Sequence, residues 1–167
     1  MKKLILLTLL SGCGQESLEN TLPSRDIETR FLPDFEKFID IAEEYGFYPS
    51  LNDVRYMQTD DSINTKGVVG VCYPNTTLKR EYYFPEHREE EYTYAMIKIV
   101  SDAKISTLKL DLKQIIYHEL LHCIFKVGHS GNIDDIMYPT LRKSSISIDQ
   151  RLRNKFSEIR DGEKEDK

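Results

Sequence analysis

Three histidines and a glutamate stand close together in the segment HELLHCIFKVGH. On a helix, His118 and His122 are about one turn apart, so both imidazoles project from the same face. His129 follows Gly128, and a glycine that ends the helix in the left-handed conformation would turn His129 back toward the first two histidines. A catalytic zinc ion takes three protein ligands and keeps one position open for water. The spacing therefore predicts a site for one zinc ion on His118, His122 and His129.

Glu119 stands directly after the first of these histidines. Zinc lowers the pKa of a bound water to near neutrality, and a carboxylate in this position can take the proton of that water. Asp134 and Asp135 are alternative oxygen ligands, but imidazole is the commoner zinc ligand in such a set. The pattern predicts metal-assisted hydrolysis with Glu119 as general base and without an organic cofactor.

Helices and short strands are predicted to position these residues. Apolar residues at helical spacing predict a helix from Asp34 to Gly46, and another from Ile148 to Ile159. Asp111 is placed to cap the histidine helix, with Gln114 three residues later as in a capping box. Segments rich in Val, Ile and Tyr predict strands of one twisted mixed sheet at 54–58, 68–73, 81–84 and 94–100. The run HREEEY before the last strand, including the lone His87, is predicted to be a solvated loop or hairpin end.

The chain of 167 residues is long enough for one domain with a core, which we predict at 33–160. Residues 13–32 lack clear periodicity and are predicted to form a tether, and the charged tail 161–167 is predicted to be disordered. A net charge of -5 argues against nucleic acid as a partner. Oligomeric state cannot be read from the sequence, and a monomer is assumed.

The N-terminal segment MKKLILLTLLSGC has the order of an export signal: lysines, a short apolar run, small residues and a cysteine. Its end, Leu10-Ser11-Gly12-Cys13, resembles a bacterial lipobox, in which residues 1–12 are removed and Cys13 receives lipid. This resemblance implies a protein anchored to a membrane by lipid in the bacterial cell envelope, facing the periplasm or the exterior.

If Cys13 is lipidated, Cys72 and Cys123 remain as a pair in a compartment where disulfides persist. A bridge between them is one hypothesis. Two buried free thiols that behave as small apolar side chains are the alternative.

The histidine segment together with Met137 resembles the metzincins, and in particular the matrixins. Their pattern is HExxHxxGxxH followed by a turn that carries a methionine, the Met-turn. Here the residues HSGNIDDIMYP, with Met137 eight residues after His129, look much like the matrixin version. The third histidine falls eleven residues after His118 rather than ten, and Phe125 stands where the family has glycine. The resemblance covers roughly residues 112–159, and small exported bacterial metallopeptidases look similar over a longer stretch.

This resemblance implies a single α+β domain of the zincin type, with a twisted mixed sheet, an active-site helix, a Met-turn and a C-terminal helix. It implies a zinc-dependent endopeptidase that hydrolyses peptide bonds in proteins or peptides outside the cytoplasm. Such enzymes bind peptide as an extra strand on a sheet edge, for which residues 68–73 are the candidate. Two other functions stay open: a catalytically idle, zinc-stabilised binding lipoprotein, and a structural lipoprotein without metal.

Overall fold

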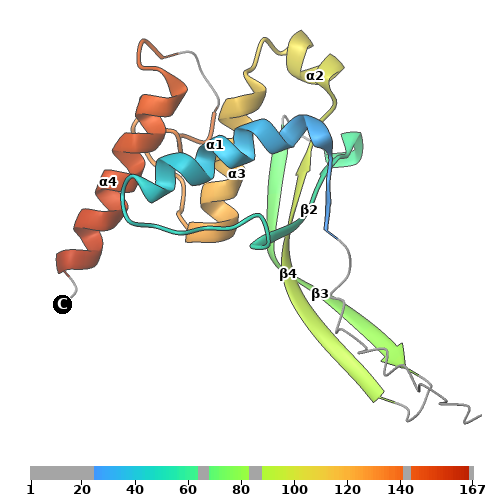
Figure 1. Ribbon diagram of the computed structural model, residues 1–167. Coiled ribbons are helices and arrows are strands. Elements are labelled where there is room, and N and C mark those ends of the chain that lie inside the picture. Colours follow the sequence, from blue (N-terminus) through green and yellow to red (C-terminus); the bar gives the residue numbers. More distant parts are fainter. Residues whose placement is uncertain (1–24, 64–67, 83–87, 141–143, 166–167) are drawn as a thin grey trace, which may run out of the picture.

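The computed structural model describes residues 25–63, 68–82, 88–140 and 144–165, and the side chains of these residues except those of 78–93 and 163–165. Within this part, four α-helices and one four-stranded mixed sheet form an α+β fold (Figure 1). None of the helices described is both long and apolar enough to cross a membrane. The predicted export signal, Cys13 and His87 lie outside the described residues.

The sheet has the strand order β1-β2-β4-β3. Strands β1 (Asp26–Ile27), β2 (Val54–Thr59) and β4 (Arg88–Ile99) run parallel, and β3 (Gly70–Tyr82) is an antiparallel edge strand beside β4. Strand β1 lies within the predicted tether, and Phe31 just after it is fully buried. The folded part therefore begins before residue 33.

The hairpin of β3 and β4 corrects the strand prediction. Strand β3 is continuous where two strands and a break around Pro74 were predicted. Proline is tolerated here because β3 is an edge strand, and a register shift between Tyr73 and Thr76 absorbs the irregularity. Residues 88–92, in the run predicted to be a solvated loop or hairpin end, belong to β4 of this hairpin. The register sets Arg80 opposite Glu90.

One helix packs on the sheet, and two further helices pack against that helix and against each other. Helix α3 (Leu112–Phe125) packs against β3 and β4, and α1 (Leu32–Glu43) contacts both α3 and α4 (Ile148–Glu165). The short helix α2 (Asp102–Thr107) was not predicted. Helix α4 continues through residues 161–165, so most of the tail predicted to be disordered is helical. Two 3-10 turns, η1 (Thr29–Phe31) and η2 (Asp61–Ile63), complete the described elements.

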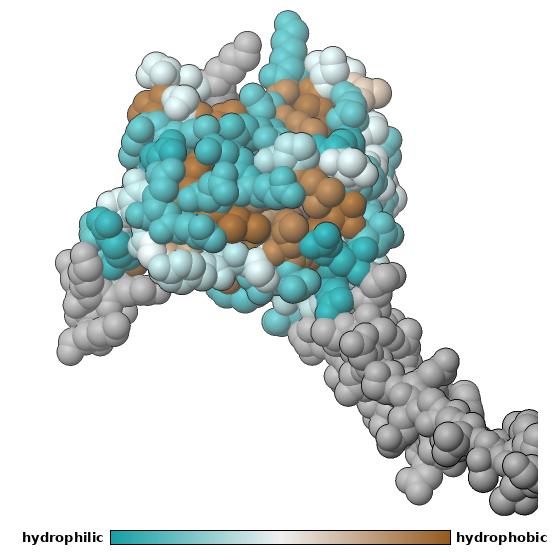
Figure 2. Space-filling model, in the orientation of Figure 1, coloured by the Kyte–Doolittle hydropathy of each residue, from teal (hydrophilic) through white to brown (hydrophobic). Residues whose placement is uncertain are grey.

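Aromatic side chains join the helices into one core. Phe38 of α1 packs against both Tyr117 of α3 and Phe156 of α4, with ring centroids 5.7 and 5.4 Å apart. Phe125, at the end of α3, stacks edge-on against Phe156. The surface over these elements is mostly hydrophilic, with separate apolar patches (Figure 2). Burial of the aromatic cluster fixes α3, and with it the histidine segment, against its neighbours.

The two ends of α3 differ from their predictions. Asp111 is the N-cap and its carboxylate accepts a hydrogen bond from Lys113 N at 2.9 Å. This bond goes to the second residue of the helix and not to Gln114 N, as it would in a capping box, and Gln114 Nε2 is buried without a partner in the described part of the chain. The helix ends at Phe125, and the left-handed residue is Lys126 (φ 57°), not Gly128. Lys126 Nζ donates to Cys123 O at 2.6 Å, so this lysine caps the helix with its side chain as well.

Replacing Lys126 by glycine should stabilise the chain. The left-handed conformation costs a residue with a Cβ roughly 1 kcal/mol, and glycine avoids that cost. We expect Lys126→Gly to raise the free energy of unfolding in urea by up to about 1 kcal/mol. The gain is reduced by whatever the hydrogen bond from Lys126 Nζ to Cys123 O contributed. Lys126→Ala is the matched control, because it loses the same amine and keeps the Cβ. Equal destabilisation by both substitutions would contradict this account.

Candidate metal centre

Helix α3 and the loop after it bring the three predicted ligands together. His118 and His122 project from one face of α3, and the left-handed turn at Lys126 returns the chain so that His129 meets them. The Nε2 atom of His122 lies 3.1 Å from Nε2 of His118 and 3.1 Å from Nε2 of His129. His118 is buried, His122 is half-buried and His129 is exposed, so the group opens to solvent on the side of His129.

Backbone carbonyls fix the protons of the two helical histidines. Nδ1 of His118 lies 2.9 Å from Ile136 O, and Nδ1 of His122 lies 2.6 Å from Val127 O. A carbonyl oxygen only accepts hydrogen bonds, so each Nδ1 carries the proton. In the neutral rings both Nε2 atoms are then bare, with their lone pairs facing one another.

Burial keeps these rings neutral. It lowers the pKa of His118 to about 4, and it lowers the pKa of His122 below its ordinary value. Two lone pairs 3.1 Å apart without a proton between them repel one another. A cation between the Nε2 atoms would remove that repulsion, and this arrangement of donors fits a metal ion.

The distances are compatible with a divalent metal ion such as zinc. Nitrogens that each lie about 2.1 Å from one tetrahedral zinc ion are about 3.4 Å apart, close to the observed separations. The alternative oxygen ligands do not join the group: the Asp135 carboxylate lies 2.5 Å from Lys155 Nζ, and the Asp134 carboxylate accepts from Ser144 Oγ at 2.7 Å. Met137 is fully buried one residue after Ile136, whose carbonyl holds His118.

Glu119 lies beside the histidines at the junction of α3 and β3. Its side chain is buried, and the backbone N–H of Cys72 donates a hydrogen bond to the carboxylate. Burial raises the pKa of Glu119 to about 8, although the bond from Cys72 acts in the opposite direction. In the chain without metal, this carboxyl group therefore resists ionisation at neutral pH.

Gly70 is a site residue that the sequence reading did not single out. A Cβ on Gly70 would lie 2.8 Å from Glu119 Oε1 and 2.8 Å from Ile115 Cγ2. The absence of a side chain thus lets β3 approach α3 and cover the carboxylate. An isolated glycine within the strand-like segment VVGVCYP was the available signal, since such a glycine often marks a close backbone approach.

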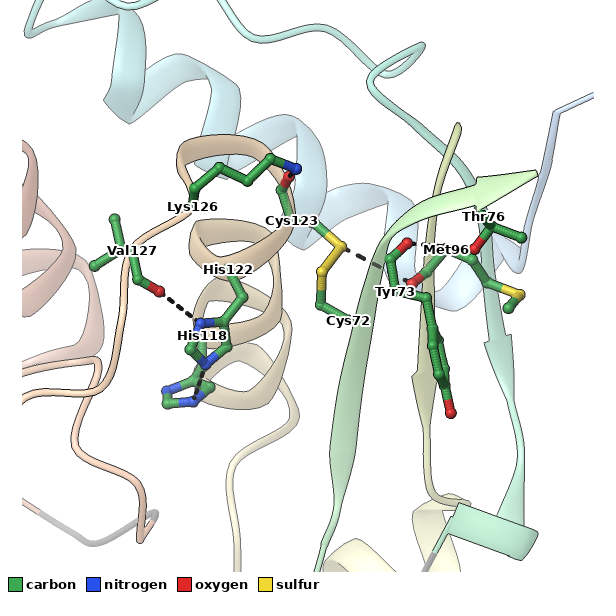
Figure 3. Close-up of a disulfide and its surroundings, with 9 residues drawn as sticks. All are labelled: Cys72, Tyr73, Thr76, Met96, His118, His122, Cys123, Lys126 and Val127. Carbon is green, nitrogen blue, oxygen red and sulfur yellow. Dashed lines mark hydrogen bonds between the residues drawn. A yellow bond between two sulfur atoms is a disulfide. The ribbon is translucent and has the colours of Figure 1, made fainter. Parts of the chain in front are cut away.

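A disulfide joins the same two elements. Cys72 of β3 and Cys123 of α3 are bridged, with Cα atoms 5.6 Å apart, as in the first of the two hypotheses for this pair. Figure 3 shows the bridge between helix and edge strand, next to the turn that bears His118 and His122. The bridge joins residues with a sequence separation of 51 and holds the edge strand at the helix that carries His118 and His122.

Clefts extend on both sides of the histidines along β3. The larger, of about 560 Å³, is walled by apolar side chains together with Glu119 and His129; the apolar lining residues are Val68, Val69, Leu108, Leu110, Ile115 and Pro139. The other, of about 450 Å³, lies toward Cys72 and Pro74 and includes the charged Lys126. Gly70, Glu119 and His129 line both clefts, so a ligand that fills the two would cross the histidine group.

Comparison with protein families, with curated proteins and with solved structures found no match to this chain. The family resemblance therefore rests on the motif residues alone.

The pKa of Glu119 predicts how pH changes the stability of the metal-free chain. A carboxyl group whose pKa is about 8 when folded and near its ordinary value of 4.5 when unfolded binds more protons in the native state between these two values. The contribution of Glu119 to stability then falls as pH rises from about 4.5 to about 8. In urea unfolding with a chelator present, we expect Glu119→Gln to gain stability relative to wild type across that window, by a few kcal/mol at most. The pKa shifts of the histidines occur in both proteins and cancel in the comparison. A stability difference between the two proteins that does not vary with pH would therefore refute the raised pKa of Glu119.

Proposed function

We propose that this protein is a zinc-dependent endopeptidase of the metzincin type, which hydrolyses peptide bonds in proteins or peptides outside the cytoplasm. The observation that carries the proposal is the facing pair of bare Nε2 atoms of His118 and His122, with His129 Nε2 beside them. Three imidazoles with an open side toward solvent are the ligand set of a catalytic rather than a structural zinc site.

Glu119 supplies the remaining chemistry. A zinc ion at the three Nε2 atoms would polarise the scissile carbonyl and make a water molecule acidic enough to attack it near neutral pH. The pKa of Glu119 falls when a cation lies nearby, which leaves the carboxylate free to accept the proton of the attacking water. As the C–N bond breaks, Glu119 passes that proton to the leaving amine nitrogen. A site that only stored or bound metal would need no such base.

The edge strand gives the reason to favour a peptide substrate. Val69 O accepts from Val100 N, so the alternate residues Gly70 and Cys72 direct their backbone groups away from β4. The N–H of Cys72 bonds to Glu119, and no bond from the backbone groups of Gly70 to another element is found among the described residues, so these groups could pair with a ligand. An extended peptide paired with this edge would pass through both clefts and bring one carbonyl to the metal. The apolar cleft would take an apolar side chain.

The cellular setting is part of the proposal. The segment ending in Cys13 has the order of a lipoprotein signal, and a disulfide between Cys72 and Cys123 suits an oxidising compartment. We therefore propose a lipid-anchored enzyme of the bacterial cell envelope, facing the periplasm or the exterior.

Metal content tests the ligand set. The full-length chain, loaded with zinc and desalted, should carry about one zinc per chain by mass spectrometry, because three preset imidazoles leave one open position. His122→Ala and His129→Ala should each lose most of it. Tyr48→Ala, a change at an exposed residue, is the control and should retain the metal. Full zinc in His129→Ala would move the third ligand elsewhere, and no zinc in wild type would remove the basis of the proposal.

Turnover tests the general base. Glu119→Gln keeps the shape of the side chain and all three imidazoles, so it should bind zinc like wild type and cleave a quenched fluorescent peptide library about 10²–10⁴-fold more slowly. Glu36→Gln, the same change on an exposed face of α1, should cleave at the wild-type rate. Zinc binding without cleavage by the wild-type chain would favour the alternative of an idle, zinc-stabilised binding lipoprotein.

A further inference from the structure

The loop between His129 and α4 is organised around one buried carboxylate. Asp135 has a side chain only 7% exposed, and Lys155 Nζ lies 2.5 Å from its Oδ2. Its Oδ1 accepts from Met137 N at 2.9 Å, and the Ser130 hydroxyl bonds to the same carboxylate. No metal ligand touches this group directly. One of its partners, Ser130, is next to His129 in the chain, and another, Met137, follows Ile136, whose carbonyl binds His118.

The first link leads to His118. The Asp135 carboxylate accepts a hydrogen bond from the N–H of Met137. That N–H and the carbonyl of Ile136 belong to the same peptide group. The orientation of the Ile136 peptide is thereby fixed, and its carbonyl accepts from His118 Nδ1 at 2.9 Å. A free neutral imidazole can carry its proton on either nitrogen, so this carbonyl decides which nitrogen of His118 is bare.

The second link leads to His129. Ser130 follows His129 directly, its hydroxyl bonds to Asp135, and its N–H donates to Met137 O at 2.9 Å. The loop thus closes on itself beside the third ligand, with the Asp135 carboxylate at its centre. Because His129 is exposed and lies outside any helix, the loop supplies order that the helix gives to the other ligands.

Helix α4 anchors this loop through two cations four residues apart, which lie on one face of the helix. Arg151 is 3% exposed, and its Nε donates to Asp134 O at 2.8 Å while Nη2 donates to Asp135 O. Lys155 is 8% exposed and also bonds to Glu158, whose side chain is largely solvent-exposed. Burial acts to raise the pKa of Asp135, but its bonds to Lys155, Met137 and Ser130 outweigh burial and hold the pKa below its ordinary value.

We propose that Asp135, held by Lys155, is a positioning residue of the metal centre, which presents the Ile136 carbonyl to His118 and so leaves His118 Nε2 bare for the metal. This inference depends on the proposed function only in assuming that a metal ion binds at the histidines. It assigns a role in the site to the C-terminal helix, which reaches the histidines through Lys155, Asp135 and the turn at Met137. Ligand-orienting partners of this kind change metal affinity without touching the metal.

The tautomer of His118 is the first measurement, and it needs no metal. Long-range ¹H–¹⁵N spectra of the full-length, metal-free chain labelled in histidine should show the wild-type His118 with its proton on Nδ1, assigned through His118→Gln. In Asp135→Asn, which keeps the size of the side chain and loses its charge, the Nε2–H form should appear beside it. Lys155→Met should show the same second form, whereas Lys155→Arg, which keeps the positive charge, should give the wild-type spectrum.

Zinc affinity is the second measurement, made by competition with a chromophoric chelator. Asp135→Asn and Lys155→Met should weaken binding about 10–100-fold, the range typical of such partners, and Lys155→Arg should recover most of the loss. Glu158→Gln is the matched control, because it removes a carboxylate from the same ammonium without touching the loop. It should stay within about twofold of wild type.

The outcomes separate this inference from the proposed function. Wild-type tautomer and wild-type affinity in folded Asp135→Asn and Lys155→Met would overturn the positioning role. A wild-type chain that binds no zinc would overturn the proposed function, while the tautomer measurement would still decide the role of Asp135. If these two variants fail to fold, Ser130→Ala removes one bond to the same carboxylate from a loop position. An unchanged zinc affinity in Ser130→Ala would then count against the proposal.

Discussion

Two bare imidazole nitrogens with no proton between them are the constraint on which the rest of this structure depends. His118 and His122 each donate a hydrogen bond from Nδ1–H to a backbone carbonyl, and their Nε2 atoms lie 3.1 Å apart. The one-turn spacing on α3 sets that distance, and the loops after the helix supply the carbonyls of Ile136 and Val127. A cation bound at these nitrogens would remove the repulsion between their lone pairs. Metal binding is therefore expected to stabilise the fold as well as to equip the site.

The edge strand serves the site in two ways, and both require its close approach to α3. Gly70 admits the Glu119 side chain, and the N–H of Cys72 holds the carboxylate. The bridge from Cys72 to Cys123 ties the strand to the helix at the same place. The edge of β3, along which a peptide would pair, is therefore fixed relative to Glu119, the proposed general base. An edge strand held only by packing would leave that distance free to vary.

The parts of the site that follow from local spacing could be predicted from the sequence, and the parts set by distant contacts could not. The helical spacing of His118 and His122 needs no tertiary information, and Asp111 identifies the helix start. The turn was assigned to Gly128 because glycine is the usual left-handed residue, whereas the structure uses Lys126. Asp135 gave no local signal for its role, because its partner Lys155 comes 20 residues later on another helix.

The position of that turn explains how His129, at an unusual count from His118, still reaches the other two histidines. In HExxHxxGxxH, the glycine that makes the turn stands three residues before the third histidine. Lys126 stands three residues before His129, so the additional residue lengthens α3 and leaves the segment from turn to ligand unchanged. His129 Nε2 accordingly lies 3.1 Å from His122 Nε2. In this chain the three histidines come together because a left-handed residue, Lys126, stands three residues before His129. That residue does not have to be a glycine, and His129 does not have to stand ten residues after His118.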